Sequence, residues 1–147
     1  MKKLKIYLDN CCLNRPFDDQ LPLTVRMEAE SVLFIQDQIK QERIELVWSS
    51  ILDLENEANP FESRKKSIRS WRNEAILLVK PSDELRKLAS TIQKVGLKPK
   101  DSLHVASAII SQCDYLITTD HVILKKNFPN IAIVNPIHFV QIFEKGE

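Results

Sequence analysis

Residues 115–120 read Tyr-Leu-Ile-Thr-Thr-Asp, a short apolar and β-branched run that ends in an acid. A continuous run of this kind is typical of a strand that is buried on both faces of a parallel sheet. Leu4, Ile6 and Leu8 mark another strand, which ends directly before Asp9. Because ligand sites of such sheets lie beyond the carboxyl ends of the strands, the acids that follow both strands indicate a polar site there.

Segments with helical spacing alternate with these strands. The apolar pattern predicts helices at 24–42, 51–59, 61–78, 82–95, 99–112 and 136–143, with a short one from residue 121. Further strands are predicted at 44–48 and 131–134, and a polar loop at 9–20. Strands and helices that alternate without tight hairpins predict one α/β domain over 1–147, a three-layer α/β/α sandwich with a mainly parallel sheet.

The composition excludes several classes of protein. The 147 residues carry 21 basic and 20 acidic side chains, so the net charge of +1 does not favour nucleic-acid binding by bulk charge. Two glycines, Gly96 and Gly146, are too few for a glycine-rich phosphate loop. Without a long apolar stretch or a signal peptide, the sequence predicts a cytoplasmic protein with no membrane segment. Three cysteines without metal-ligand spacing predict neither a disulfide framework nor a zinc site.

Four acids are expected at the carboxyl edge of the predicted sheet. Asp9 and Asp120 follow strands, Asp101 opens a helix, and Glu55 lies in the helix after a strand. Neighbouring carboxylates raise one another's pKa unless a cation binds them. Oxygen donors with no histidine or thiol partner favour Mg²⁺ or Mn²⁺, which can activate water and neutralise charge on a phosphoryl oxygen. The set therefore predicts a magnesium or manganese site.

Simpler explanations exist for single acids of this set. Asp101 could complement the dipole of its helix, and Asp120 could cap the helix that starts at residue 121. Glu55 has no such explanation, because it is expected on the apolar helix face of Ile51 and Leu54.

Glu57 is the rival for the place of Glu55 if the helix starts later. Its spacing puts it on the opposite helix face, with Asp53. Both assignments stay open at this point.

The strings around these acids resemble those of the PIN-domain metal-dependent nucleases. The matches lie at 6–9, 49–55, 100–108 and 116–120, in the right order along nearly the whole chain. The most specific is Asp-Ser-Leu-His-Val-Ala-Ser-Ala at 101–108 with Thr-Thr-Asp at 118–120. The resemblance implies a PIN-like fold and a Mg²⁺- or Mn²⁺-dependent ribonuclease, often the toxin of a VapC-like toxin–antitoxin pair. By position, the metal-binding and catalytic residues would be Asp9, Glu55, Asp101 and Asp120.

Two hydroxyl residues are candidates for support of the acids. Thr118 and Ser49 are placed to hydrogen-bond the carboxylates or a metal-bound water, or simply to cap and fill. His104 lies one helical turn after Asp101 and is interpreted as a structural hydrogen-bonding group and not as a general base.

A basic segment supplies candidate contacts to single-stranded RNA. Its residues are Arg64, Lys65, Arg69 and Arg72, with Trp71 available to stack on a base. The same residues could instead form a solvated helix face. Their mixture of basic and apolar groups would also suit an acidic antitoxin or a second copy of the chain as protein partner.

Other functions are weighed against the ribonuclease. A PIN-like module that only binds RNA or protein remains an alternative. A phosphoryl-accepting receiver is disfavoured, since Asp9 is followed by Asn10 and the late dipeptide is Asn135-Pro136 and not Lys-Pro. A phosphatase of the haloacid-dehalogenase kind would need an acid where Cys11 stands.

Overall fold

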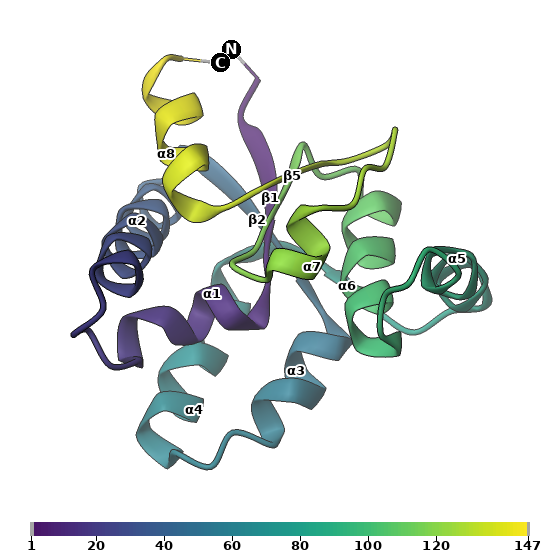
Figure 1. Cartoon of the computed structure of the whole chain (residues 1–147), viewed down its shortest axis with the longest axis horizontal. Coiled ribbons are helices and arrows are strands. Elements are labelled where there is room, and N and C mark those ends of the chain that lie inside the picture. Colours follow the sequence, from purple (N-terminus) through teal and green to yellow (C-terminus); the bar gives the residue numbers. More distant parts are fainter. Residues whose placement is uncertain (1, 147) are drawn as a thin grey trace.

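The computed structural model describes residues 2–146 and has a five-stranded sheet at its centre (Figure 1). The strands stand in the order β3-β2-β1-β4-β5, and every neighbouring pair is parallel. Their bounds are β1 Leu4–Leu8, β2 Ile44–Ser49, β3 Ala75–Val79, β4 Tyr115–Ile117 and β5 Ala132–Val134. The order reverses at β1, so the carboxyl ends of β1 and β4 form a topological switch point, the usual place of a ligand site.

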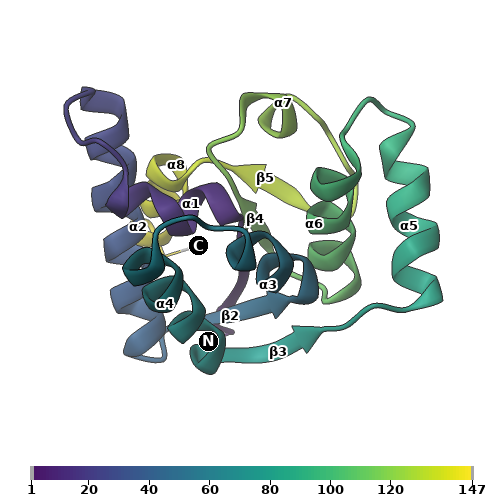
Figure 2. The same ribbon diagram turned by 90° about the horizontal axis from the view of Figure 1, so that it is seen from below.

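Helices cover both faces of the sheet and gather at its carboxyl edge. Helices α2 and α8 lie on one face, and α6 with α5 outside it lies on the other (Figure 2). Their bounds are α1 Asn10–Asn14, α2 Leu23–Lys40, α3 Ser50–Glu57, α4 Glu62–Ser70, α5 Asp83–Gln93, α6 Pro99–Ile110, α7 His121–Leu124 and α8 Pro136–Glu144. The three-layer α/β/α architecture predicted from the sequence is confirmed. No helix within residues 2–146 combines the length and apolar character needed to cross a bilayer.

The central strand β1 is buried on both sides. Ile6, Tyr7 and Leu8 are each at most 1% exposed, because helices pack on both faces of the sheet. Because Tyr7 is buried in β1, its hydroxyl needs hydrogen-bond partners inside the protein.

The prediction of one helix over 61–78 is wrong. Helix α4 ends at Ser70, a 3₁₀ turn spans Trp71–Glu74, and β3 follows. The run Ala-Ile-Leu-Leu-Val at 75–79 is short and continuously apolar, and such a run fits a helix or a strand equally well by periodicity. Pairing with β2 decides in favour of the strand.

The prediction of a polar loop over 9–20 is also wrong in part. The segment contains α1 and a 3₁₀ turn at Arg15–Phe17. The Asp9 carboxylate accepts a hydrogen bond from the Asn10 amide and caps α1. Pro16 stands in the first turn of the 3₁₀ helix, where a missing amide hydrogen costs nothing.

Candidate active site

Asp9 lies at the point where β1 and β4 end side by side. The Asp9 amide donates to the carbonyl of Ile117 at 3.0 Å, which ties the two strand ends together. The Thr118 hydroxyl donates to Asp9 Oδ2 at 2.8 Å, and the Asn10 amide donates to Oδ1 at 2.7 Å. The buried Asp9 carboxylate is thus held in one orientation by hydrogen bonds, one of them from Thr118, the residue considered for support of the acids.

Glu55 and His104 reach Asp9 from two different helices. His104 Nε2 lies 2.5 Å from Glu55 Oε1 and 3.5 Å from Asp9 Oδ1. The three side chains offer ligand atoms that all lie within 4.8 Å of one another. Helix α3 begins directly after β2 and α6 runs beside it, so both helices bring their residues to the carboxyl edge of the sheet. The result is a compact acidic group with one imidazole between two carboxylates.

A chain of hydrogen bonds holds the His104 ring at Nδ1, the ring nitrogen that does not contact Glu55. The Tyr7 hydroxyl is 2.6 Å from His104 Nδ1 and 2.6 Å from Ser49 Oγ. Ser49 Oγ also accepts from the Leu52 amide and caps α3. Burial raises the pKa of Tyr7 well above its ordinary value, so its hydroxyl keeps its proton. Ser49 therefore supports Glu55 through Tyr7 and His104 and contacts no carboxylate directly.

The charge of the two acids acts on His104. Burial lowers the pKa of this imidazole, but the charges of Asp9 and Glu55 and the hydrogen bond to Glu55 outweigh it, and the pKa is raised. A protonated ring donates from Nε2 to Glu55 and from Nδ1 to Tyr7. His104 is the structural hydrogen-bonding group expected from the sequence, and its Nε2 lies between the two carboxylates.

Asp101 and Asp120 stand at the border of this group. They are not among the ligand atoms within 4.8 Å, and neither has a hydrogen bond to Asp9 or Glu55 among residues 2–146. Burial, and after it the charges of Asp120 and Asp9, raise the pKa of Asp101. The Asp120 carboxylate accepts from the Val122 and Ile123 amides and caps α7. The charges of Asp120 and Asp9 thus act on Asp101. Asp120 also caps α7, as the sequence allowed.

The structure separates Glu55 from Glu57. Glu57 is exposed and forms a 3.5 Å ion pair with Lys65, away from Asp9. The expected apolar face of α3 is partly wrong, however, because Leu54 is 60% exposed and the buried residues are Ile51, Leu52 and Asn56. Glu55 turns inward because its Oε1 is hydrogen-bonded to His104 Nε2, and not because its helix face is apolar.

Sequence reasoning missed two side chains of the site. Tyr7 lies between Ile6 and Leu8, which mark the strand, and a tyrosine in a fully buried strand signals a polar partner nearby. Cys11 received no role from the sequence beyond the exclusion of a disulfide or zinc site, yet its sulfur lies 3.5 Å from Asp9 Oδ2 and 3.4 Å from Thr118 Oγ1. No sequence signal distinguishes this cysteine from Cys12, which is buried.

Most of the basic segment is engaged within the protein. Arg64 donates to the Phe17 carbonyl at 2.7 Å and stacks on the Phe61 ring, with 4.6 Å to its centroid. Lys65 pairs with Glu57 and Arg72 pairs with Asp53, each at 3.5 Å. Arg69 is exposed and has no ion pair among residues 2–146. It is therefore the member of the segment whose charge stays available to a ligand.

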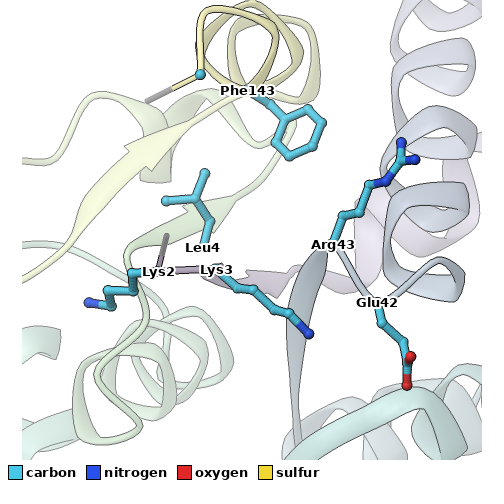
Figure 3. Close-up of a pocket in the computed structure, with 7 residues that line it drawn as sticks. Lys2, Lys3, Leu4, Glu42, Arg43 and Phe143 are labelled. Atoms are coloured by element: carbon cyan, nitrogen blue, oxygen red, sulfur yellow. The ribbon is translucent and has the colours of Figure 1, made fainter.

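A hollow of about 390 Å³ lies at the opposite, amino end of the sheet (Figure 3). Leu4 and Phe143 contribute its apolar part, and Lys2, Lys3 and Arg43 place basic groups around it. Leu4 begins β1, whereas Asp9 follows its end, so this hollow is separate from the acidic group.

Comparisons with known proteins bear on the fold. No protein-family model matches the sequence, and neither does any curated protein. The structure is similar to a chain in the crystal structure of VapBC2 from Rickettsia felis bound to a DNA fragment from their promoter. The two chains share 16% sequence identity with a TM-score of 0.56, over 90% of this chain and 98% of the other. The chain therefore has the PIN-like three-layer α/β/α fold that its sequence predicted.

Proposed function

We propose that the protein is a Mg²⁺- or Mn²⁺-dependent endoribonuclease that hydrolyses phosphodiester bonds of single-stranded RNA. The observation that carries this proposal is the convergence of Asp9 and Glu55, from distant parts of the chain, at the switch point of a parallel sheet. Asp101 and Asp120 add two further carboxylates at the same edge, and the pKa of Asp101 is raised first by burial and then by the charges of Asp120 and Asp9. The fold likeness to a VapBC2 chain supports the same reading.

The two carboxylates of the group fit a hard divalent cation, whereas its imidazole differs from the all-oxygen donor set expected from the sequence. Asp9 and Glu55 offer carboxylate oxygens that lie within 4.8 Å of each other and of His104. Asp9 and Glu55 would hold the metal, with Asp101 and Asp120 completing its surroundings through water or directly. When bound, such a metal polarises a water molecule and neutralises charge on a phosphoryl oxygen.

The other residues orient the acids and hold protons. Thr118 donates to Asp9 Oδ2 and the Asn10 amide donates to Oδ1, so both oxygens of Asp9 are held in place. His104 keeps a proton on Nε2 beside Glu55 Oε1, and Tyr7 fixes the imidazole from Nδ1. Thr118 and Tyr7 are thus positioning residues, and their removal would loosen the acids without deleting any carboxylate.

The substrate and partner follow from the same site and surface. Arg69 lies outside the internal ion pairs and offers a phosphate contact. We propose RNA as substrate, and an antitoxin protein as regulator, in line with the VapBC2 likeness.

A second candidate function is a binding module without cleavage activity. The observation that favours it is His104, which already supplies a cation-like partner to Asp9 and Glu55. If the imidazole stays between the two carboxylates, a metal has to displace it before it can bind both.

One experiment separates the two candidates. Labelled RNA and DNA oligonucleotides are incubated with the purified protein and Mn²⁺, Mg²⁺ or EDTA, beside Asp9→Asn and the surface control Asp19→Asn. The nuclease predicts metal-dependent RNA cleavage that is lost in Asp9→Asn and kept in Asp19→Asn, because Asp19 only caps a turn at the surface. Folded protein that cuts nothing with either metal, and shows no heat of Mn²⁺ binding in calorimetry, would overturn the nuclease and leave the binding module as the candidate.

A further inference from the structure

The imidazole of His104 stands within bonding reach of a metal held by Asp9 and Glu55. Its Nε2 lies 2.5 Å from Glu55 Oε1 and 3.5 Å from Asp9 Oδ1. With metal–ligand bonds of about 2.1 Å, neighbouring ligand atoms lie about 3 Å apart, and the two observed distances bracket this spacing. A divalent cation that binds both carboxylates therefore meets the imidazole nitrogen as a third donor atom.

The ring of His104 is fixed in this place by Tyr7 of β1. His104 is 1% exposed, and its ring packs edge-on against that of Tyr7, with 5.6 Å between the centroids. The Tyr7 hydroxyl also holds Nδ1 at 2.6 Å. A metal that expelled the ring would break this contact and leave the buried hydroxyl with Ser49 as its remaining partner. The packing thus favours a metal that binds His104 over one that expels it.

The hydrogen bonds of the ring suit a metal-bound imidazole. Histidine ligands of metals bind through one ring nitrogen and donate from the other to a fixed acceptor. The Tyr7 hydroxyl is placed to accept from Nδ1 and to donate to Ser49 Oγ, at 2.6 Å from each. A neutral ring in this tautomer carries its lone pair on Nε2, the nitrogen that faces both carboxylates.

Glu55 provides the route by which an ion reaches the group. Its side chain is 19% exposed, and within the described chain, from residue 2 to 146, its Oε2 has no hydrogen bond. The side chains of Asp9 and His104 are 8% and 1% exposed and form the buried end of the group. The three donors thus form a site with an entry path, as a metal requires.

We propose that His104 Nε2 is a direct ligand of the metal, beside Asp9 and Glu55, and that this nitrogen makes the site select first-row transition ions such as Mn²⁺ over Mg²⁺. The inference rests on the metal site proposed above and adds a nitrogen to its oxygen ligands. Imidazole is a good ligand for transition ions, whereas Mg²⁺ prefers carboxylate oxygens and water. The proton that Nε2 carries in the metal-free protein passes to solvent when the metal binds.

Electron spin echo envelope modulation of the Mn²⁺-loaded protein tests the ligand directly, because it detects nitrogen bonded to the metal. We expect a nitrogen coupling in the wild type that changes when the three histidines carry ¹⁵N, a comparison that needs no variant. The coupling is expected to be absent in His104→Gln. It is expected to stay in the control His138→Gln, which alters an exposed histidine of α8.

Calorimetry without RNA measures the selectivity. Mn²⁺ is expected to bind the wild type at least about tenfold more tightly than Mg²⁺, and His104→Gln is expected to lose most of this preference while His138→Gln keeps it.

The outcomes separate this proposal from the nuclease. Mn²⁺ that binds without histidine coupling, or a coupling that survives in His104→Gln, overturns the nitrogen ligand and leaves an all-oxygen nuclease site standing. Equal affinity of the wild type for Mn²⁺ and Mg²⁺ overturns the selectivity in the same way. Protein that binds neither ion overturns both this proposal and the metal-dependent nuclease.

Discussion

Replacement of Tyr7 by phenylalanine tests the hydrogen-bonded chain behind the acidic group. The substitution keeps the ring, which is fully buried in β1, and removes only the hydroxyl. That hydroxyl lies 2.6 Å from both Ser49 Oγ and His104 Nδ1. Without it, His104 Nδ1 has no partner inside the protein, whereas Ser49 Oγ keeps the bond from the Leu52 amide.

The size of the effect follows from these two losses. A buried polar group left without a partner costs about 1–3 kcal/mol, and a lost neutral hydrogen bond about 1 kcal/mol. Because Ser49 keeps one bond, most of the cost falls on His104, and we expect the free energy of unfolding to drop by about 2–3 kcal/mol. The raised pKa of His104 extends the pH range in which the ring is charged, and a charged ring needs the hydroxyl more.

Urea unfolding monitored by circular dichroism measures this loss, with the midpoint expected to fall and the slope expected to stay unchanged. The matched control is Tyr115→Phe. Tyr115 is half-buried and packs edge-on against Phe139 at 5.5 Å, and its hydroxyl has no hydrogen bond among residues 2–146. We expect the control to change stability by less than about 0.5 kcal/mol. Equal losses in the two variants would refute the proposed role of the Tyr7 hydroxyl.

Five further substitutions probe the site and its surroundings. Glu55→Gln is expected to abolish metal-dependent RNA cleavage, and Glu57→Gln to leave it unchanged, since only Glu55 faces Asp9; the opposite result in the cleavage assay would assign the site to Glu57. Asp101→Asn is expected to stabilise the metal-free protein at pH 7, in urea unfolding with EDTA. Because the folded-state pKa of Asp101 is raised, its favourable contribution to the free energy of unfolding is present below the ordinary value of 3.8 and is lost as pH rises through the folded-state pKa. The stability gained by Asp101→Asn must therefore vanish in acid. Arg64→Ala is expected to lower the melting temperature, because Arg64 stacks on the Phe61 ring and donates to the Phe17 carbonyl. Arg69→Ala is expected to weaken RNA binding without changing the melting temperature. A loss of stability in Arg69→Ala and none in Arg64→Ala would contradict the contacts described.

Sequence patterns located the strands that bear acids but not every strand. β1 and β4 could be predicted because alternation in one, and a continuous apolar run in the other, both end at an acid. β3 could not, because its five apolar residues follow a helix and carry no turn signal before them. The strand is defined by pairing with β2, a contact that lies outside any local window.

The same limit applies to the candidate site. The positions of Asp9 and Asp120 at the sheet edge follow from the strand ends alone. The contact of His104 with Glu55 joins residues 49 positions apart and depends on how α3 and α6 approach each other. Helical periodicity describes one helix at a time, so it placed Glu55 on a face without revealing what that face meets.

The parallel pairing of β1 with β4 also bears on when the protein becomes active during its synthesis. Asp9 leaves the ribosome early, but the hydroxyl of Thr118 that orients it lies 109 residues later. A nascent chain that still lacks β4 can form the β1–β2 pair and the bond from the Asn10 amide to Asp9 Oδ1, yet it lacks the Thr118 hydroxyl that holds Asp9 Oδ2. For a chain that hydrolyses RNA, as proposed above, this order of assembly keeps the growing polypeptide inactive beside the message and the ribosomal RNA that produce it, until translation has passed the fourth strand.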